Sequence, residues 1–185
     1  MKAGILALQG DYREHAAVLA DCGVTPVFVR TPHDLETVEC LAIPGGESTT
    51  MARLAGLHGL IEPIKRRALS GMPVFGTCAG MIVMAKEVVD GDPLLGLVDL
   101  RVVRNGYGRQ ADSFETHLEI PQLGQIRAVF IRAPVVESVG EEVEVLAEFE
   151  GRPVVCEQGN LMVSAFHPEL VGDVRLHRRF LEKVA

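Results

Sequence analysis

The stretch from Val74 to Ile82, VFGTCAGMI, constrains the fold more than any other part of this chain. Its apolar start is typical of a buried strand, and an apolar helical pattern follows it through Val83, Met84 and Val88. Glycines on both sides of a central residue permit the tight strand-to-helix turn called a nucleophile elbow. The pattern predicts that Cys78 lies at a helix start, where unpaired N–H groups favour a thiolate. A small buried cysteine is the structural alternative.

Strand and helix patterns alternate through the first half of the chain. This order predicts a parallel sheet with helices on both faces, and ligands of such sheets bind beyond the carboxyl ends of the strands. Asp11 is placed to cap the first helix, and Ser48 to cap the helix that follows Gly45-Gly46. The strands are expected at 2–8, 24–30, 39–43 and 72–75, the helices at 12–21, 48–54, 60–69 and after Cys78, and a short helix or turn at 31–35.

The second half is rich in strand patterns that are separated by turns. These patterns predict an antiparallel insertion in one three-layer α/β domain spanning residues 1–185, with a last helix at 173–184. The strands are expected at 97–104, 113–120, 126–131, 143–149, 153–158 and 161–166.

Composition narrows the possible functions. The net charge is −7 and no long basic run occurs, which argues against nucleic acid as the main partner. No apolar run approaches the ~20 residues of a membrane span, and no signal peptide is expected. The four cysteines are widely spaced without a Cys-x-x-Cys pair, so neither a metal site nor a disulfide framework is predicted. Such cysteine usage favours a reducing cytoplasm.

The segment Phe166-His167-Pro168-Glu169-Leu170 follows the last expected strand. Pro168 disfavours helix at His167, and in an extended segment residues two apart project to the same side. His167 and Glu169 are therefore predicted to point together as a general base and its orienting carboxylate. The structural alternative is a turn with a surface acid. The other histidines, His15 and His177 among them, are predicted to be structural or solvated.

Gly45 and Gly46 end the third expected strand and suit a backbone pocket that receives developing negative charge. The N–H groups of Gly46 and Ala79 are the expected oxyanion donors. Glu47 either receives a substrate ammonium group or holds the loop. Arginine guanidinium groups bind carboxylates in bidentate fashion, and Arg104 and Arg132 both follow apolar strand patterns. Without a pocket, both would be ordinary surface arginines.

The Cys elbow with His-x-Glu resembles the class I, triad-type glutamine amidotransferases. More narrowly, the chain resembles the glutaminase subunits of pyridoxal 5′-phosphate synthase. Gly-x-Cys-x-Gly alone is shared by many amidotransferases, whereas the other motifs, in this order, are more specific. The motifs are LALQG from Leu6, REH from Arg13, PGGESTT from Pro44, GTCAGMI from Gly76, RN-x-x-GRQ-x-DSFE from Arg104, FIRAP from Phe130 and FHPEL from Phe166.

The resemblance implies a flavodoxin-like, class I glutamine amidotransferase fold. It implies hydrolysis of L-glutamine to glutamate and ammonia through a cysteine thioester, without a cofactor. Cys78 would be the nucleophile, His167 the base and Glu169 its partner. Glutamine would be bound by Gly45, Gly46, Glu47, Arg104, Ile131 and Arg132.

The resemblance also implies a partner, a separate (β/α)8-barrel synthase subunit that uses the ammonia to build pyridoxal phosphate. The glutaminase would be poorly active alone, and Gln9 to His15 would lie near the interface. Three alternatives stay open: a glutaminase of another amidotransferase complex, a non-catalytic regulatory subunit on the same scaffold, and a cysteine peptidase on a related fold.

Overall fold

Five parallel strands form the middle of the structure, a computed structural model that describes residues 1–106 and 113–184. Each lies against its neighbours in the order β12-β4-β3-β1-β2. This is the strand order of flavodoxin-like sheets, the fold that the resemblance implied. The parallel strands are β1 (Lys2–Leu6), β2 (Thr25–Val29), β3 (Cys40–Ile43), β4 (Val74–Thr77) and β12 (Leu161–Ser164).

Further strands, most of them in antiparallel pairs, extend and accompany this sheet. β10 (Glu144–Phe149) and β11 (Arg152–Gln158) continue it beyond β12 to give seven strands. A second sheet contains β5 (Ala85–Val88), β6 (Val98–Val103) and β9 (Val135–Val139). A hairpin contains β7 (Ser113–Ile120) and β8 (Gly124–Ile131).

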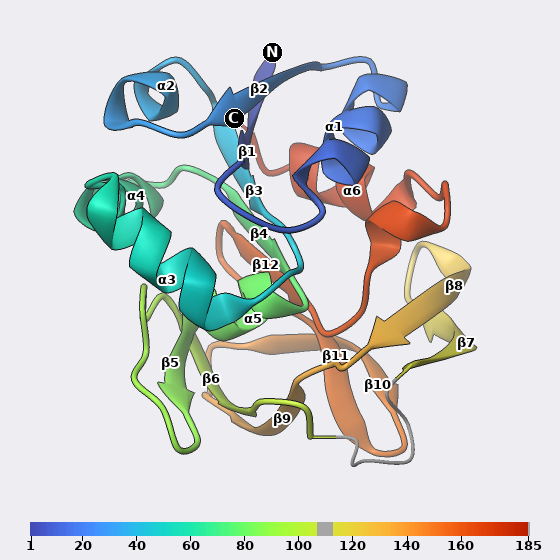
Figure 1. Cartoon of the computed structure of the whole chain (residues 1–185). Helices are drawn as coiled ribbons and strands as arrows, with labels where there is room; N and C mark the ends of the chain where they lie inside the picture. The colour runs from blue at the N-terminus through green and yellow to red at the C-terminus, as the bar shows by residue number, and fades with distance from the viewer. Residues whose placement is uncertain (107–112, 185) are drawn as a thin grey trace.

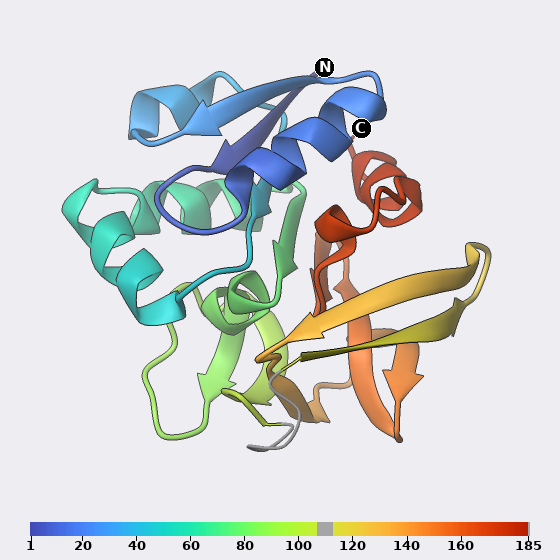
Figure 2. The same cartoon turned by 45° about the vertical axis from the view of Figure 1, so that its right-hand side comes forward.

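Helices cover both faces of the large sheet, which confirms the predicted layers. In Figures 1 and 2, α1 and α6 lie on one side of the sheet, and α3 and α4 lie on the other. The helices are α1 (Tyr12–Asp21), α2 (Pro32–Glu36), α3 (Ser48–Leu57), α4 (Ile61–Leu69), α5 (Ala79–Met84), the 3-10 helix η1 (Pro168–Leu170) and α6 (Arg175–Leu181).

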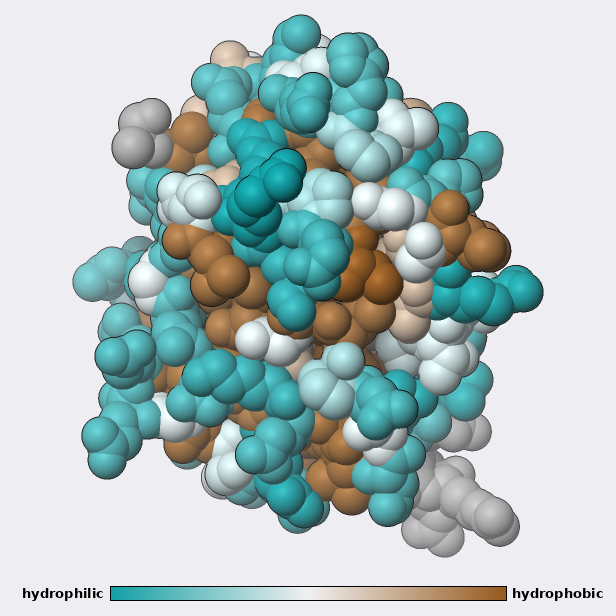
Figure 3. Space-filling model, turned by 90° about the vertical axis from the view of Figure 1, so that its left-hand side faces the viewer, coloured by the Kyte–Doolittle hydropathy of each residue, from teal (hydrophilic) through white to brown (hydrophobic). Residues whose placement is uncertain are grey.

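The core follows from this layering. Every residue of β3, β4 and β12 is buried, because strands covered on both faces must be apolar throughout rather than alternating. The face on the side of α3 and α4 shows apolar side chains among polar ones (Figure 3). Leu57 and Leu69, which end these two helices, are strongly exposed. In the described part of the chain, no helix has the length and apolar character needed to cross a membrane.

Two local expectations differ from the structure. The helical pattern after Cys78 was expected to continue to Val88, but α5 ends at Met84 and β5 begins at Ala85. Ala85 adopts an extended backbone and pairs with Val98, so strand pairing outweighs the local helical pattern. β9 was not expected; it forms because Val135 to Val139 complete an antiparallel partner for β6. The segment with Gly108, Arg109, Gln110 and Asp112 lies outside the described residues.

The helix caps also differ. Glu47, not Ser48, caps α3, and Ser48 is the buried first helical residue. Asp11 precedes α1 as expected, but its side chain makes no cap hydrogen bond. The longer side chain of Glu47 reaches the N–H groups of Thr49 and Thr50, whereas the carboxylate of Asp11 faces His167.

Candidate functional site

Cys78 lies at a strained turn between β4 and α5. Its backbone angles are φ 49° and ψ −105°, a conformation that side-chain-bearing residues rarely adopt. The N–H of Cys78 donates to the carbonyl of Ser164 at 2.8 Å, so β12 fixes the turn. A side chain at Gly80 would collide with the carbonyl of Ile43, which explains the second glycine of the motif. The predicted elbow geometry is present.

His167 and Glu169 lie together, as expected, but for a different structural reason. His167 Nδ1 and Glu169 Oε1 are 2.8 Å apart. Glu169 belongs to the single turn of η1 rather than to an extended segment, and Pro168 opens that turn. The backbone N–H of His167 donates to the carbonyl of Val129 in β8, which fixes the start of the turn.

Asp11 is a site residue that the sequence reasoning missed. Its Oδ2 lies 3.3 Å from His167 Nδ1, so this nitrogen faces two carboxylates. The cap interpretation concealed it, because an acid before a helix has an ordinary structural role. Its position after Gly10, at the carboxyl end of β1, was the available signal. The loop after β1 lies against the loop after β3, because the N–H of Asp11 donates to the carbonyl of Gly45 at 3.1 Å.

Electrostatics favour a charged histidine beside buried acids. Burial alone would lower the pKa of His167, but hydrogen bonds with Asp11, Cys78 and Glu169 raise it above its ordinary value. Burial raises the pKa of Glu169, and the hydrogen bond with His167 opposes that rise. The site can therefore hold a proton on His167 opposite a carboxylate.

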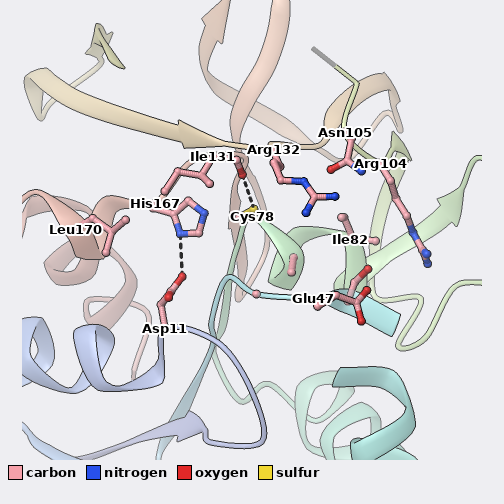
Figure 4. A pocket seen from close by; sticks show the side chains of 13 residues that line it. Asp11, Glu47, Cys78, Ile82, Arg104, Asn105, Ile131, Arg132, His167 and Leu170 are labelled. Carbon is pink, nitrogen blue, oxygen red and sulfur yellow. Dashed lines mark hydrogen bonds and ion pairs between the residues drawn. The ribbon is translucent and has the colours of Figure 1, made fainter. Parts of the chain in front are cut away.

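A pocket of about 300 Å³ opens over Cys78 (Figure 4). Gly45 packs directly against the His167 ring, where an added Cβ would lie 2.7 Å from Nδ1. Glu169 lies behind the His167 ring. The lining contains seven of the predicted site residues besides Cys78, namely Gly46, Glu47, Ala79, Arg104, Ile131, Arg132 and His167, and five others, Asp11, Ser48, Ile82, Asn105 and Leu170.

Glu47 holds its loop and lines the pocket as well. Its carboxylate accepts hydrogen bonds from the N–H groups of Thr49 and Thr50 and from both hydroxyls. The threonine hydroxyls are the main reason that the pKa of Glu47 is lowered to about 2. Its own N–H donates to Gln9 Oε1 at 2.7 Å. A permanently ionised carboxylate thus faces the pocket.

The two arginines differ in direction. In Figure 4 the Arg132 guanidinium points over the pocket beside Cys78, whereas the Arg104 guanidinium is directed away from Cys78. Arg104 Nε is buried without a hydrogen-bond partner among the described residues. The thiol of Cys78 faces the carbonyl of Ile131 at 3.7 Å. Arg132 is therefore better placed than Arg104 to meet an anion in this conformation.

A cation has one candidate position among the described residues. Ligand atoms of Asp11, His167 and Glu169 lie within 4.8 Å of one another. His167 Nδ1 and Glu169 Oε1 are already within hydrogen-bond distance at 2.8 Å, so a metal ion there would have to break this hydrogen bond. The arrangement suits proton transfer better than metal ligation.

The fold and the site define a class of protein. A solved crystal structure of a glutamine amidotransferase is 48% identical, with a TM-score of 0.95 over 98% of each chain. PurLQS from Thermotoga maritima, at 16% identity and a TM-score of 0.72, shares the fold. The chain thus has the fold of the class I glutamine amidotransferases.

The narrower assignment comes from sequence comparison. The model of the SNO glutamine amidotransferase family matches residues 5–185, and the chain belongs to this family. It is 52% identical to the pyridoxal 5′-phosphate synthase subunit PdxT of Carboxydothermus hydrogenoformans, covering 100% of this chain and 98% of the relative. It is 54% identical to the same subunit of Pelotomaculum thermopropionicum, covering 99% and 95%. The resemblance inferred from the motifs is confirmed.

Proposed function

We propose that this chain hydrolyses L-glutamine to glutamate and ammonia, and delivers the ammonia to a synthase subunit that makes pyridoxal 5′-phosphate. The observation that carries the proposal is the strained Cys78 elbow, which opens into a pocket beside the hydrogen-bonded His167–Glu169 pair. Family membership supports the reaction, and the names of the relatives support the partner. We expect the partner to be of the barrel type, and both subunits to work in the cytoplasm.

The proposed mechanism begins with the Cys78 thiolate, which attacks the side-chain carbonyl of glutamine. The backbone N–H groups of Gly46 and Ala79 stabilise the oxyanion, each by ~3 kcal/mol of the barrier. The imidazolium of His167 donates its proton to the departing ammonia, leaving a glutamyl thioester on Cys78. Neutral His167 then activates water for thioester hydrolysis, while Glu169 holds the ring.

The charged groups of the pocket match the two ends of an amino acid. Glu47 faces it with a carboxylate that suits the α-ammonium group, and Arg132 offers a guanidinium that suits the α-carboxylate. Arg104 would contribute after a change of side-chain direction. Gly45 leaves room for the His167 ring, and Ile131 supplies the carbonyl beside the thiol. We take residues 1–185 as one glutaminase domain.

The test is glutamate release from L-glutamine, with and without the synthase subunit of the Carboxydothermus relative. Cys78→Ala should lower turnover at least ~1000-fold without loss of folding, because no other group can form the thioester. Cys22→Ala, which removes a half-buried thiol that faces the carbonyl of Val174, is the matched control and should retain activity. Unchanged turnover in Cys78→Ala would refute the mechanism, and turnover that the synthase subunit leaves unchanged would argue against the partner.

A further inference from the structure

A buried polar cluster lies behind the candidate triad. It joins His15 of α1, Thr77 of β4, Glu169 of η1 and His177 of α6, which bring together three distant parts of the sequence. His15, Thr77 and His177 are fully buried, and Glu169 is 4% exposed. Buried polar groups cost free energy unless they are paired, so this cluster requires an explanation beyond packing.

The contacts run in a chain toward the triad. His177 Nε2 lies 3.0 Å from His15 Nδ1. His15 Nε2 lies 3.0 Å from Thr77 Oγ1 and 3.5 Å from Glu169 Oε2. The other oxygen of Glu169, Oε1, faces His167 Nδ1. His15 is therefore the group that meets the outer carboxylate oxygen, the one without a full hydrogen bond among the described residues.

The chain of contacts selects one arrangement of protons. Burial first, and then the neighbouring His177 and His167, lower the pKa of His15, so its ring is neutral and carries one N–H. A lone pair on Nε2 would face the carboxylate and repel it. The N–H therefore belongs on Nε2 and is directed toward Glu169 and Thr77, while Nδ1 accepts from His177 Nε2–H.

We propose that His15 is a positioning residue for glutamine hydrolysis. Its Nε2–H keeps the Glu169 carboxylate ionised and aimed at His167, which in turn stabilises the imidazolium opposite the Cys78 thiolate. The inference rests on the proposed function, because it concerns the same triad. His15 touches neither substrate nor the reacting atoms and acts through Glu169.

The surroundings of Glu169 give the direction of the effect. His167 and His15 face its two oxygens, and the nearby charge of Asp11 disfavours its ionised form. Behind His15 stand His177 and, beyond it, Asp173, whose charge acts on His177. When the His15 N–H is removed, burial and the charge of Asp11 still oppose ionisation of Glu169, and one hydrogen bond that favours it is lost. Glu169 then takes up a proton more readily, the imidazolium loses support, and the thiolate forms at higher pH.

The test is the pH profile of Cys78 alkylation by iodoacetamide in the full chain, followed by mass spectrometry of the Cys78 peptide. In His15→Phe the profile should move up by about 0.5 pH unit, which lowers the rate near pH 7 about three-fold. Turnover should fall about ten-fold in kcat, with KM within two-fold. Val18→Ala, which removes buried packing from the same helix, is the matched control and should move neither quantity.

Two further variants keep the test decisive where His15→Phe fails to fold. In His15→Gln the amide takes the place of Nε2 and can still donate to Glu169, whereas in His15→Asn it takes the place of Nδ1 and meets only His177. The inference predicts a nearly normal profile for Gln and a shifted profile for Asn. Equal profiles in both variants would overturn it. Retained turnover in Cys78→Ala would instead remove the proposed function, so the two failures are distinguishable.

Discussion

The pocket has two walls that differ in burial and charge. In the inner wall, His167 lines the pocket and Glu169 lies behind it; both are at most 4% exposed, and His15 and His177 are buried further back. The outer wall contains Glu47, Arg104 and Arg132, which lie on loops and are wholly or partly exposed. Proton transfer and substrate recognition therefore require opposite environments in one pocket. A proton relay needs low dielectric and fixed geometry, whereas recognition of a charged amino acid needs access and reach.

The two walls also differ in their cost to stability. The inner wall keeps two neutral histidines and a carboxylate away from water, each of which would be better solvated in the unfolded chain. The outer wall keeps its charges near solvent, where they cost little. Perturbing the inner wall should therefore change stability or catalysis, and perturbing the outer wall should change mainly affinity.

The largest effect expected from the difference between the two walls is a loss of stability at mildly acidic pH that originates in the inner wall. Burial lowers the pKa of His177 to about 4, from about 6.5 when unfolded. The unfolded chain binds the proton first as pH falls below 6.5, so His177 destabilises the fold by about 2 kcal/mol at pH 5. Urea unfolding at pH 7.5 and pH 5 measures the difference.

The matched variant for this measurement is His177→Gln, which can still donate to His15 but does not titrate. The stability that wild type loses on going from pH 7.5 to pH 5 should shrink by about 2 kcal/mol in the variant. His15 contributes in the same direction in both proteins, and the raised pKa values of Glu169 and His167 oppose it in both. Because His177 is also one of the groups that lower the pKa of His15, the comparison reports the buried His15–His177 pair. Identical pH dependence would mean that His177 is solvated.

The next effect belongs to the outer wall. Arg132→Met keeps the apolar stem but removes the guanidinium over the pocket, so KM for glutamine should rise about ten-fold, or about 1.4 kcal/mol. The value of kcat should stay within three-fold, because Arg132 is not part of the proton path. Steady-state kinetics decide this, with Arg152→Met at the distant start of β11 as the control. A fall in kcat at constant KM would contradict the division of labour between the walls.

The smallest effect concerns the cap of α3. Glu47→Ala removes the carboxylate that accepts from the N–H groups of Thr49 and Thr50, which should cost about 1 kcal/mol of stability. Because Glu47 also faces the pocket, KM should rise too. Asp34→Ala removes a capping-box carboxylate on α2, away from the pocket, and is the matched control. We expect both variants to lose stability and only Glu47→Ala to raise KM. A normal KM in Glu47→Ala would mean that Glu47 caps the helix and does not bind substrate.

How far the sequence predicts this structure depends on how local each signal is. The elbow around Cys78 and the helix from Tyr12 to Asp21 were predicted closely, because glycine spacing and helical periodicity are contained in short segments. The His167–Glu169 pair was predicted from residues two apart, although a 3-10 turn rather than an extended strand brings them together.

The parts that were missed depend on contacts distant in sequence. Nothing near Asp11 indicates that its carboxylate faces His167, and nothing near His15 indicates that it meets His177 and Glu169. β5 and β9 likewise form because β6 lies between them. Local sequence propensity therefore predicts where most helices and strands of this chain lie. Contacts between residues distant in sequence determine which polar side chains meet in its interior.

The position of β12 has a consequence for synthesis on the ribosome. β4 ends at Thr77, but its neighbour β12 begins only at Leu161. At roughly 5–20 residues per second, the buried edge of β4 waits roughly 4–17 s for its partner. An unpaired apolar strand edge can pair with another chain and aggregate, so we expect the nascent chain to require chaperone protection during this interval. The nascent chain also holds Cys78 without His167 during that interval, so on our proposal no ammonia is released before His167 has been synthesised.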